Sequence, residues 1–144
     1  IVVTLSVAWM TVAAETVSSA SCRMSEESAA KNNWSSVTYG NGIFVAVSGD
    51  GTVMTSPNSI EWTSQTSAAN YIWYSVTYGD GFFVAVGAVD TGTAKKSVMT
   101  STDGIVWTSR TAATNNVWYG VTYGDSTFVA VSGYPSASVM TWEP

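Results

Sequence analysis

The chain has 144 residues, enough for one hydrophobic core of ordinary size, and only 10% of the residues are charged while 7 are Trp and 7 are Tyr. Apolar surface is therefore sufficient for folding, and charge is too sparse for a disordered chain. A net charge of −5 with only 5 basic residues excludes a surface that neutralises a run of phosphates, so no nucleic-acid partner is expected.

Residues 1–14 are apolar and rich in β-branched side chains, which fit a pleated sheet better than a helix and therefore predict a strand. A signal-peptide remnant is the alternative, because the run ends in the small residues Ala13 and Ala14. The run is too short to cross a bilayer as a helix, and no membrane span is expected. Residues 15–30 are polar and predict a connector, with a short helical turn over residues 25–31 as an option.

One stretch then occurs three times, as WSSVTYGNGIFVAV, WYSVTYGDGFFVAV and WYGVTYGDSTFVAV, starting at Trp34, Trp73 and Trp118. The copies are roughly 40 residues apart, a period that is typical of repeat arrays such as propellers. We therefore divide the chain into an N-terminal strand and connector and a repeat region with three units. The N-terminal strand and connector cover residues 1–30, and the repeat region covers residues 31–144. Its three units are residues 31–69, 70–114 and 115–144.

Each copy predicts a tight hairpin followed by a strand that is covered on both faces. Asn41-Gly42 and Asp80-Gly81 favour a type I′ turn, and Asp125-Ser126 keeps half of that signal. The apolar runs after these turns have no polar alternation, so both of their faces must be buried. These runs cover residues 43–47, 82–86 and 128–131.

A third strand carrying Val-Met-Thr follows in every copy, and the first two copies continue through a turn to a fourth strand. In the second copy this turn reads Ser-Thr-Asp-Gly-Ile-Val-Trp over residues 101–107. It resembles the Asp-box of bacterial-neuraminidase-type repeats, and residues 31–144 as a whole resemble the short blades of Asp-box-like propeller proteins. The stretch is one residue shorter than the usual box, and Asn58-Ser59 stands in place of Asp-Gly in the first copy.

The resemblance and the repeat pattern together predict an all-β fold, a propeller-like array of four-stranded antiparallel blades with about three blades in this chain and an incomplete ring. The third copy stops at residue 144 after its third strand, which leaves an open sheet edge that residues 1–12 could close. Because propellers usually have about four to eight blades, we expect a homo-oligomer, a partner, or further repeats of the same array. A compact sheet stack that never closes is the alternative.

Turns alternate between two ends of such a blade, and the loops between second and third strands differ most in length. Length variation on a rigid scaffold is where recognition usually lies. Amides and aromatic rings beside these loops suit a sugar, because a ring stacks on a pyranose while an amide bonds its hydroxyls. The candidate ligand-binding residues are Asn33, Tyr71, Trp73, Asn116, Trp118 and Tyr134. For the tryptophans, the competing interpretation is a wedge between neighbouring blades.

Catalysis is not expected. A neuraminidase resembling these repeats would need an arginine cluster, a Tyr nucleophile and an Asp acid, whereas the chain has only Arg23 and Arg110 as arginines. Asp80, Asp103 and Asp125 occupy turn positions that favour Asp for backbone reasons. With no His and with Cys22 as the single Cys, a structural zinc site is excluded, no loop has the acids of a calcium site, and no cofactor is expected.

Two functions of different classes fit these patterns. The first is a non-catalytic propeller module of an exported or virion-surface protein, which binds glycans or another protein through its variable loops. The second is a structural, self-assembling subunit of a filament, phage tail or surface layer, joined through its N-terminal strand. A glycosidase-like enzyme is a third and weaker option. Both leading hypotheses predict an extracellular, virion-surface or cell-surface location.

Overall fold

The computed structural model describes residues 32–88 and 97–144, which contain eleven β-strands and no helix. No helix able to span a membrane is therefore found in these two ranges. The strand expected over residues 1–12, the connector to residue 30, the signal-peptide alternative and the helical turn all lie outside the described residues.

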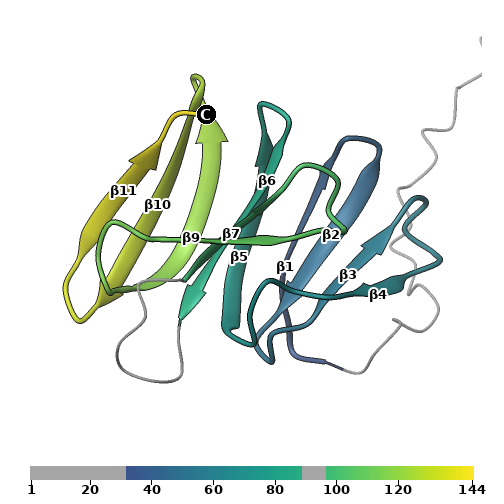
Figure 1. The fold of residues 1–144 in the computed structure, drawn as a ribbon, viewed down its shortest axis with the longest axis horizontal. Helices are drawn as coiled ribbons and strands as arrows, with labels where there is room; N and C mark the ends of the chain where they lie inside the picture. The colour runs from purple at the N-terminus through teal and green to yellow at the C-terminus, as the bar shows by residue number, and fades with distance from the viewer. Residues whose placement is uncertain (1–31, 89–96) are drawn as a thin grey trace, which may run out of the picture.

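The strands form three separate antiparallel sheets, one for each sequence copy (Figure 1). The first sheet has the order β1-β2-β3-β4, with β1 Trp34–Gly40, β2 Ile43–Ser48, β3 Val53–Ser56 and β4 Thr63–Gln65. The second has the order β5-β6-β7-β8, with β5 Ile72–Gly79, β6 Phe82–Ala88, β7 Val98–Ser101 and β8 Thr108–Arg110. The third has the order β11-β10-β9, with β9 Val117–Gly124, β10 Thr127–Tyr134 and β11 Ser138–Trp142.

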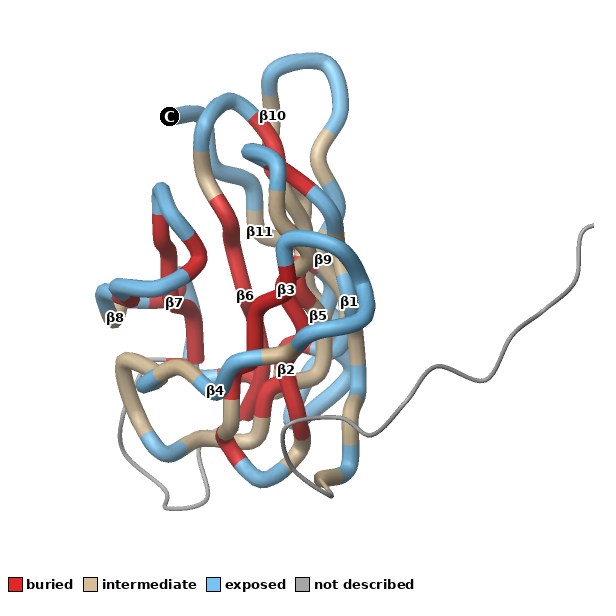
Figure 2. Tube along the Cα trace, turned by 90° about the vertical axis from the view of Figure 1, so that its right-hand side faces the viewer, coloured by how far each residue is buried: buried red, intermediate tan, exposed pale blue. Residues whose placement is uncertain are grey.

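The all-β class is thus confirmed, and so are sheets of three to four antiparallel strands. The described residues do not form a closed ring. The first strands β1, β5 and β9 lie next to one another, and the later strands lead away from them, with β4, β7 and β8 on the opposite side of the molecule (Figure 2).

The hairpin turns follow the sequence signals. Asn41 and Gly42 have φ of 47° and 80°, and Asp80 and Gly81 have φ of 43° and 80°. A type I′ turn needs positive φ at both central residues, which Asn, Asp and Gly adopt at low cost. The third hairpin keeps this backbone with Asp125 at 47°, although Ser126 stands in the glycine position.

The strand register gives each sheet two faces with different side chains. In the first sheet Val47 lies opposite Val53 on one face, and Ala46 lies opposite Met54 on the other. We call the valine face of each sheet its trailing face and the Phe-Ala-Met face its leading face. The trailing face of one sheet packs against the leading face of the next. This arrangement covers both faces of the run over residues 82–86, as its lack of polar alternation predicts, whereas Val131 of the run over residues 128–131 is exposed.

Two apolar clusters lie between the sheets, one in each interface. The first interface, between the first and second sheets, combines trailing-face Val45, Val47 and Val53 with Trp73 and Phe83. The second interface, between the second and third sheets, repeats this pattern with Val84, Val86 and Val98 against Trp118 and Phe128. The second and third strands of the first two sheets supply many of these residues, and β2, β3, β6 and β7 are accordingly largely buried (Figure 2).

Candidate functional site

The most specific contact between neighbouring sheets is made by a tyrosine ring over a glycine. A Cβ placed on Gly40 would lie 2.0 Å from the ring of Tyr78, and one on Gly79 would lie 2.0 Å from the ring of Tyr123. Neither position can therefore carry a side chain. The equivalent Gly124 of the third sheet has no atom within 4 Å of such a Cβ. Among the described residues, Gly124 therefore lacks the ring contact that is made at Gly40 and Gly79.

A hydrogen bond beside this contact also connects neighbouring sheets. The backbone N–H of Val76 donates to the Ser36 Oγ at 3.2 Å, and the N–H of Val121 donates to the Ser75 Oγ at the same distance. The third copy has Gly120 at the serine position. The trailing side of the third sheet therefore offers the glycine but not the hydroxyl acceptor.

The trailing face of the third sheet is exposed where its two equivalents are buried. Val131 and Val139 are 49% and 66% exposed. Their counterparts Val47 and Val53 in the first sheet are fully buried, and those in the second sheet, Val86 and Val98, are also buried. The same side chains in the same register thus form an interface in two sheets and an apolar surface in the third.

The leading face of the first sheet is exposed on the half that lies near the β1–β2 turn. Val37 and Tyr39 are 59% and 58% exposed, whereas the equivalent Val76 is buried. The Tyr39 ring packs against Phe44 of its own sheet, with centroids 4.7 Å apart. Ala46 and Met54, further along this face, are buried. The exposed half carries the tyrosine that the glycine contact requires.

The turns between third and fourth strands are held by one side chain that accepts backbone hydrogen bonds. Asp103 accepts from the N–H groups of Ile105 and Val106 at 2.8 and 2.9 Å. Asn58 makes the same pair of contacts in the first sheet, at 3.0 and 2.9 Å. The N–H groups of Val106 and Ile105, and the Ser101 hydroxyl, lower the pKa of the Asp103 carboxyl. This carboxyl therefore has a structural role, as expected for a turn position.

The two tryptophans predicted as ligand contacts lie in the interfaces. Trp73 and Trp118 have no exposed surface, and each belongs to one of the two apolar clusters. Their rings therefore offer no face on which a sugar could stack. They occupy the wedge position between sheets that was the competing interpretation.

Asn116 is also part of the framework. It is buried, and its side-chain amide donates to the Ser132 Oγ at 2.8 Å and to the Ser136 carbonyl at 3.1 Å. These bonds tie the link between the second and third sheets to the β10–β11 loop. The amide is thereby engaged within the chain, unlike the free amide that sugar binding would use.

The other three predicted residues lie at the same end of the molecule as this loop. Tyr134 is 66% exposed at the end of β10, and Asn33 is exposed beside the β2–β3 loop, where its carbonyl accepts from the Gly49 N–H at 2.9 Å. Tyr71 is half-buried against the first interface, with its ring 5.9 Å from that of Trp73. These residues share one end of the sheets, as the alternation of turns predicts.

An aromatic pair that the sequence reasoning missed lies on the outer side of the first strands. The rings of Tyr74 and Tyr119 are 5.2 Å apart and inclined by 39°. Tyr119 is half exposed and also lies against Gly133, next to Tyr134. The available signal was the residue after the repeated tryptophan, which is Ser35 in the first copy and Tyr in the other two.

The acidic residues in the described ranges do not form a metal site. No group of three acidic, His or Cys side chains able to hold a metal occurs within residues 32–88 and 97–144. Asp50 accepts a hydrogen bond from the Ser48 hydroxyl, which together with the Thr52 N–H lowers the pKa of its carboxyl. This aspartate thereby closes the β2–β3 loop of the first sheet.

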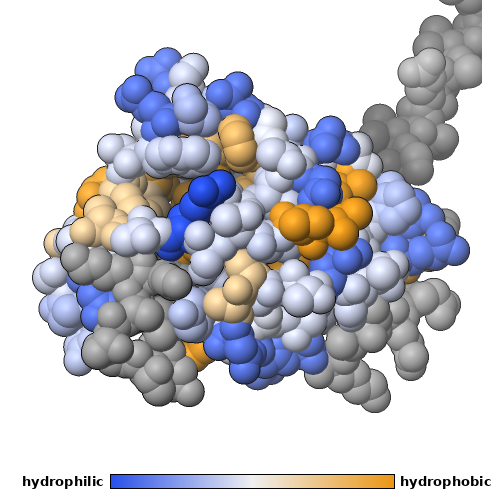
Figure 3. All heavy atoms as spheres, in the orientation of Figure 1, coloured by the Kyte–Doolittle hydropathy of each residue, from blue (hydrophilic) through white to orange (hydrophobic). Residues whose placement is uncertain are grey.

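A cavity of about 510 Å³ lies between the second and third sheets. Its apolar wall includes Phe82 and Val84 from β6 and Phe128 and Met140 from the third sheet, and Arg110 lies at its polar side. The hydrophobic recess between these sheets is visible in Figure 3. The sequence pattern predicts apolar runs that are covered on both faces and gives no signal for this cavity.

Comparison with known proteins does not assign a family. No family model matches the chain, and no curated protein matches it. Among solved structures, the chain is similar to the crystal structure of the computationally designed Ika4 protein, with 9% sequence identity and a TM-score of 0.46. The similarity covers 85% of this chain and 98% of the designed one.

Proposed function

We propose that the chain is a non-catalytic structural module that assembles by placing the leading face of one copy on the trailing face of another. The observation that carries this proposal is the exposure of Val131 and Val139, whose equivalents are buried in both internal interfaces. Exposed apolar surface of this kind marks an interaction site, and the internal interfaces define which surface it fits.

The contact between copies follows the pattern of the contact between sheets. Tyr39 of one copy would lie over Gly124 of the next, as Tyr78 lies over Gly40 within the chain. Such a contact joins two different surfaces, so it generates either a closed ring or an open filament. A propeller-like ring completed by a second copy is the closed form of this assembly. The location we propose for it is extracellular or on a virion or cell surface.

The mass of the full-length chain in solution tests the proposal. We expect light scattering to show a multimer at micromolar concentration. Val139→Glu should reduce the mass of the assembly, because the interface would bury a charge on the trailing face without a partner. Ser136→Glu, in the exposed β10–β11 loop, is the matched control and should leave the mass unchanged. A wild-type chain that stays monomeric at the highest soluble concentration would refute the proposal.

The glycine contact provides a sharper test of the geometry. Gly124→Ala adds a methyl group where the single chain has free space, but where the ring of an incoming Tyr39 would lie. We therefore expect Gly124→Ala to lower the assembled mass without lowering the stability of the monomer. Tyr39→Ala in the same chain should restore part of the assembly, because the clash is removed. Equal assembly of Gly124→Ala and wild type would show that this contact is not used.

A second candidate function is glycan binding at the loop end of the third sheet. The exposed rings of Tyr119 and Tyr134 favour it, because aromatic faces stack on sugar rings and Tyr119 also pairs with Tyr74. A panel of immobilised glycans probed with wild type, Tyr119→Ala and Tyr134→Ala tests this function. Retention on a glycan that is lost in both variants would support it, and no retention on any glycan would count against it.

A further inference from the structure

The cavity between the second and third sheets occupies the position that a turn and a tryptophan fill in the first interface. There, a Cβ on Gly104 would lie 2.8 Å from both Ile43 and Val45 of the first sheet. Trp107 follows this glycine in the same turn, is only 8% exposed, and donates its indole N–H to the Gly104 carbonyl at 2.9 Å. The β7–β8 turn is thus inserted against the preceding sheet.

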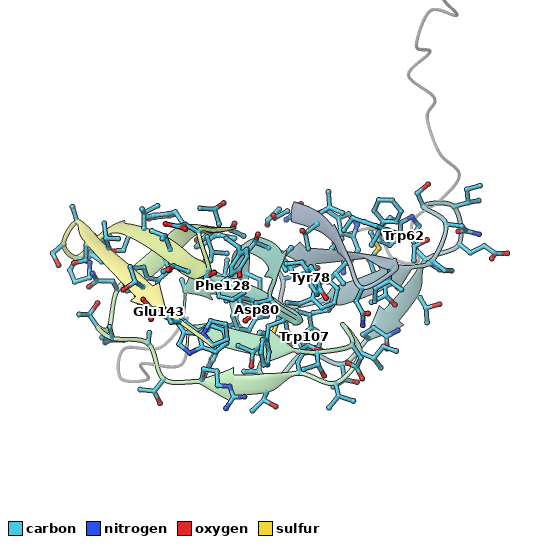
Figure 4. All side chains as sticks on the ribbon, turned by 90° about the horizontal axis from the view of Figure 1, so that it is seen from above. Trp62, Tyr78, Asp80, Trp107, Phe128 and Glu143 are labelled. Atoms are coloured by element: carbon cyan, nitrogen blue, oxygen red, sulfur yellow. The ribbon has the colours of Figure 1, made fainter. Side chains whose placement is uncertain are left out.

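The repeat register maps this arrangement onto the cavity. Ile43 and Val45 of the first sheet correspond to Phe82 and Val84 of the second, which line the cavity. Phe83, whose ring is 6.5 Å from that of Trp107, corresponds to Phe128, which also lines it. The cavity wall is therefore the same surface that holds a turn and its tryptophan in the first interface. Figure 4 labels Trp107 on the second sheet and Phe128 on the third.

Trp142 occupies part of this space without closing it. Its ring is stacked 5.1 Å from Phe128 and lies 5.5 Å from Phe82 in an edge-on arrangement. The side chain is 39% exposed and itself lines the cavity. In the described part of the chain β11 pairs with β10 alone, whereas β3 and β7 each pair with a fourth strand. An aromatic cavity and a strand edge that lacks a described neighbour are therefore combined at one place.

We propose that this place is a docking site for an extended peptide of the fourth-strand type, with an Asp-Gly turn followed by a tryptophan and a short strand. The strand would add to the edge of β11 through backbone hydrogen bonds, as β8 pairs with β7. The indole would enter the cavity, and the glycine would lie against Phe82 and Val84. The site uses neither terminal face, so it does not depend on the assembly proposed above.

The test uses the full-length chain and a fluorescein-labelled peptide with the sequence of residues 101–112, STDGIVWTSRTA. We expect fluorescence anisotropy to show saturable binding. A peptide with Ala in place of its tryptophan should bind at least about tenfold more weakly, because burial of a large aromatic side chain contributes more than about 1.4 kcal/mol. No binding of the parent peptide, or equal binding of the two peptides, would overturn the proposal.

Two variants of the chain locate the bound peptide. Ala113→Trp places a bulky ring at an exposed position that lines the cavity, and it should weaken peptide binding at least about tenfold. Thr114→Trp changes the adjacent exposed residue, which does not line the cavity, and should bind like wild type. Equal effects of the two variants, or no effect of either, would show that the peptide binds elsewhere and overturn the site.

Discussion

The two interfaces between sheets are built from the same residue types in the same register, yet only one of them is filled. In the first, the β7–β8 turn is inserted against the first sheet and Trp107 is buried. In the second, Trp142 covers part of the equivalent surface and a cavity remains. Strand pairing and the trailing-face valines alone therefore do not close an interface. The element that closes it is the turn between the third and fourth strands.

The largest expected effect is a loss of stability on replacing Trp107 in the first interface, compared with a smaller loss on replacing Trp142 in the second. Trp107→Ala should lower the free energy of unfolding by about 3–5 kcal/mol, because it leaves a void between packed sheets. Trp142→Ala removes a ring that is already 39% exposed and should cost less than about 2 kcal/mol. Urea unfolding of both variants at the same low protein concentration measures the difference in the free energy of unfolding. Equal losses would mean that the two interfaces are equally well packed.

The glycines under the tyrosine rings give the next largest effect. Gly79→Ala forces a methyl group into the Tyr123 ring and should cost about 1–3 kcal/mol. Gly124→Ala meets no atom within 4 Å and, in dilute solution, should leave stability within about 0.5 kcal/mol of wild type. The midpoints of thermal unfolding compare the two variants. A loss at Gly124 as large as at Gly79 would show that this position is covered in the monomer.

A smaller effect is expected at the hydrogen bond between sheets. Ser75→Ala removes the acceptor for the Val121 N–H and should cost about 1–2 kcal/mol, because that amide is left without its partner. Ser35→Ala is the control, since its exposed hydroxyl bonds the nearby Asn33 carbonyl at 3.4 Å and joins no neighbouring sheet among the described residues. Hydrogen exchange of the Val121 amide should increase in Ser75→Ala and stay unchanged in the control. Unchanged exchange in both would contradict the role of this bond.

The smallest expected effect is a loss of stability at acidic pH that originates in the β7–β8 turn, which fills the first interface. The Val106 and Ile105 N–H groups lower the pKa of Asp103 in the folded state. The ionised carboxyl therefore stabilises the fold above the pKa that Asp103 has in the unfolded chain. This stabilisation is lost as the pH falls through the pKa of Asp103 in the folded state. Stability should therefore decrease below about pH 4. Asp103→Asn should make this decrease shallower, since the neutral Asn58 already holds the equivalent turn. An identical acid profile in the variant would exclude Asp103 as a contributor.

Much of the local structure could be predicted from the sequence, because it depends on short-range signals. The Asn-Gly and Asp-Gly pairs set the hairpins at Asn41 and Asp80, and the apolar runs after them correctly indicated strands covered on both faces. The repeated Tyr-Gly dipeptide was also visible. Its use as a contact between sheets was not, because the tyrosine lies over a glycine of a different copy.

The candidate site was harder to predict, because a residue type does not reveal its exposure. Trp73 and Trp118 looked suitable for stacking on a sugar, but they are enclosed between sheets. Asn116 looked like a free amide, but it bonds the β10–β11 loop. Tyr119 was overlooked, although it is half exposed and paired with Tyr74.

The sequence by itself determined that the chain forms repeated antiparallel strands with tight turns, since backbone preference and side-chain pattern act over a few residues. Only the tertiary structure decided which faces are buried. Burial depends on whether a neighbouring sheet is present, so identical valines are core residues in the first and second sheets and surface residues in the third. Trp107 and Trp142 both lie between two sheets, and they differ because the turn between the third and fourth strands closes only the first interface, which leaves the cavity beside Trp142.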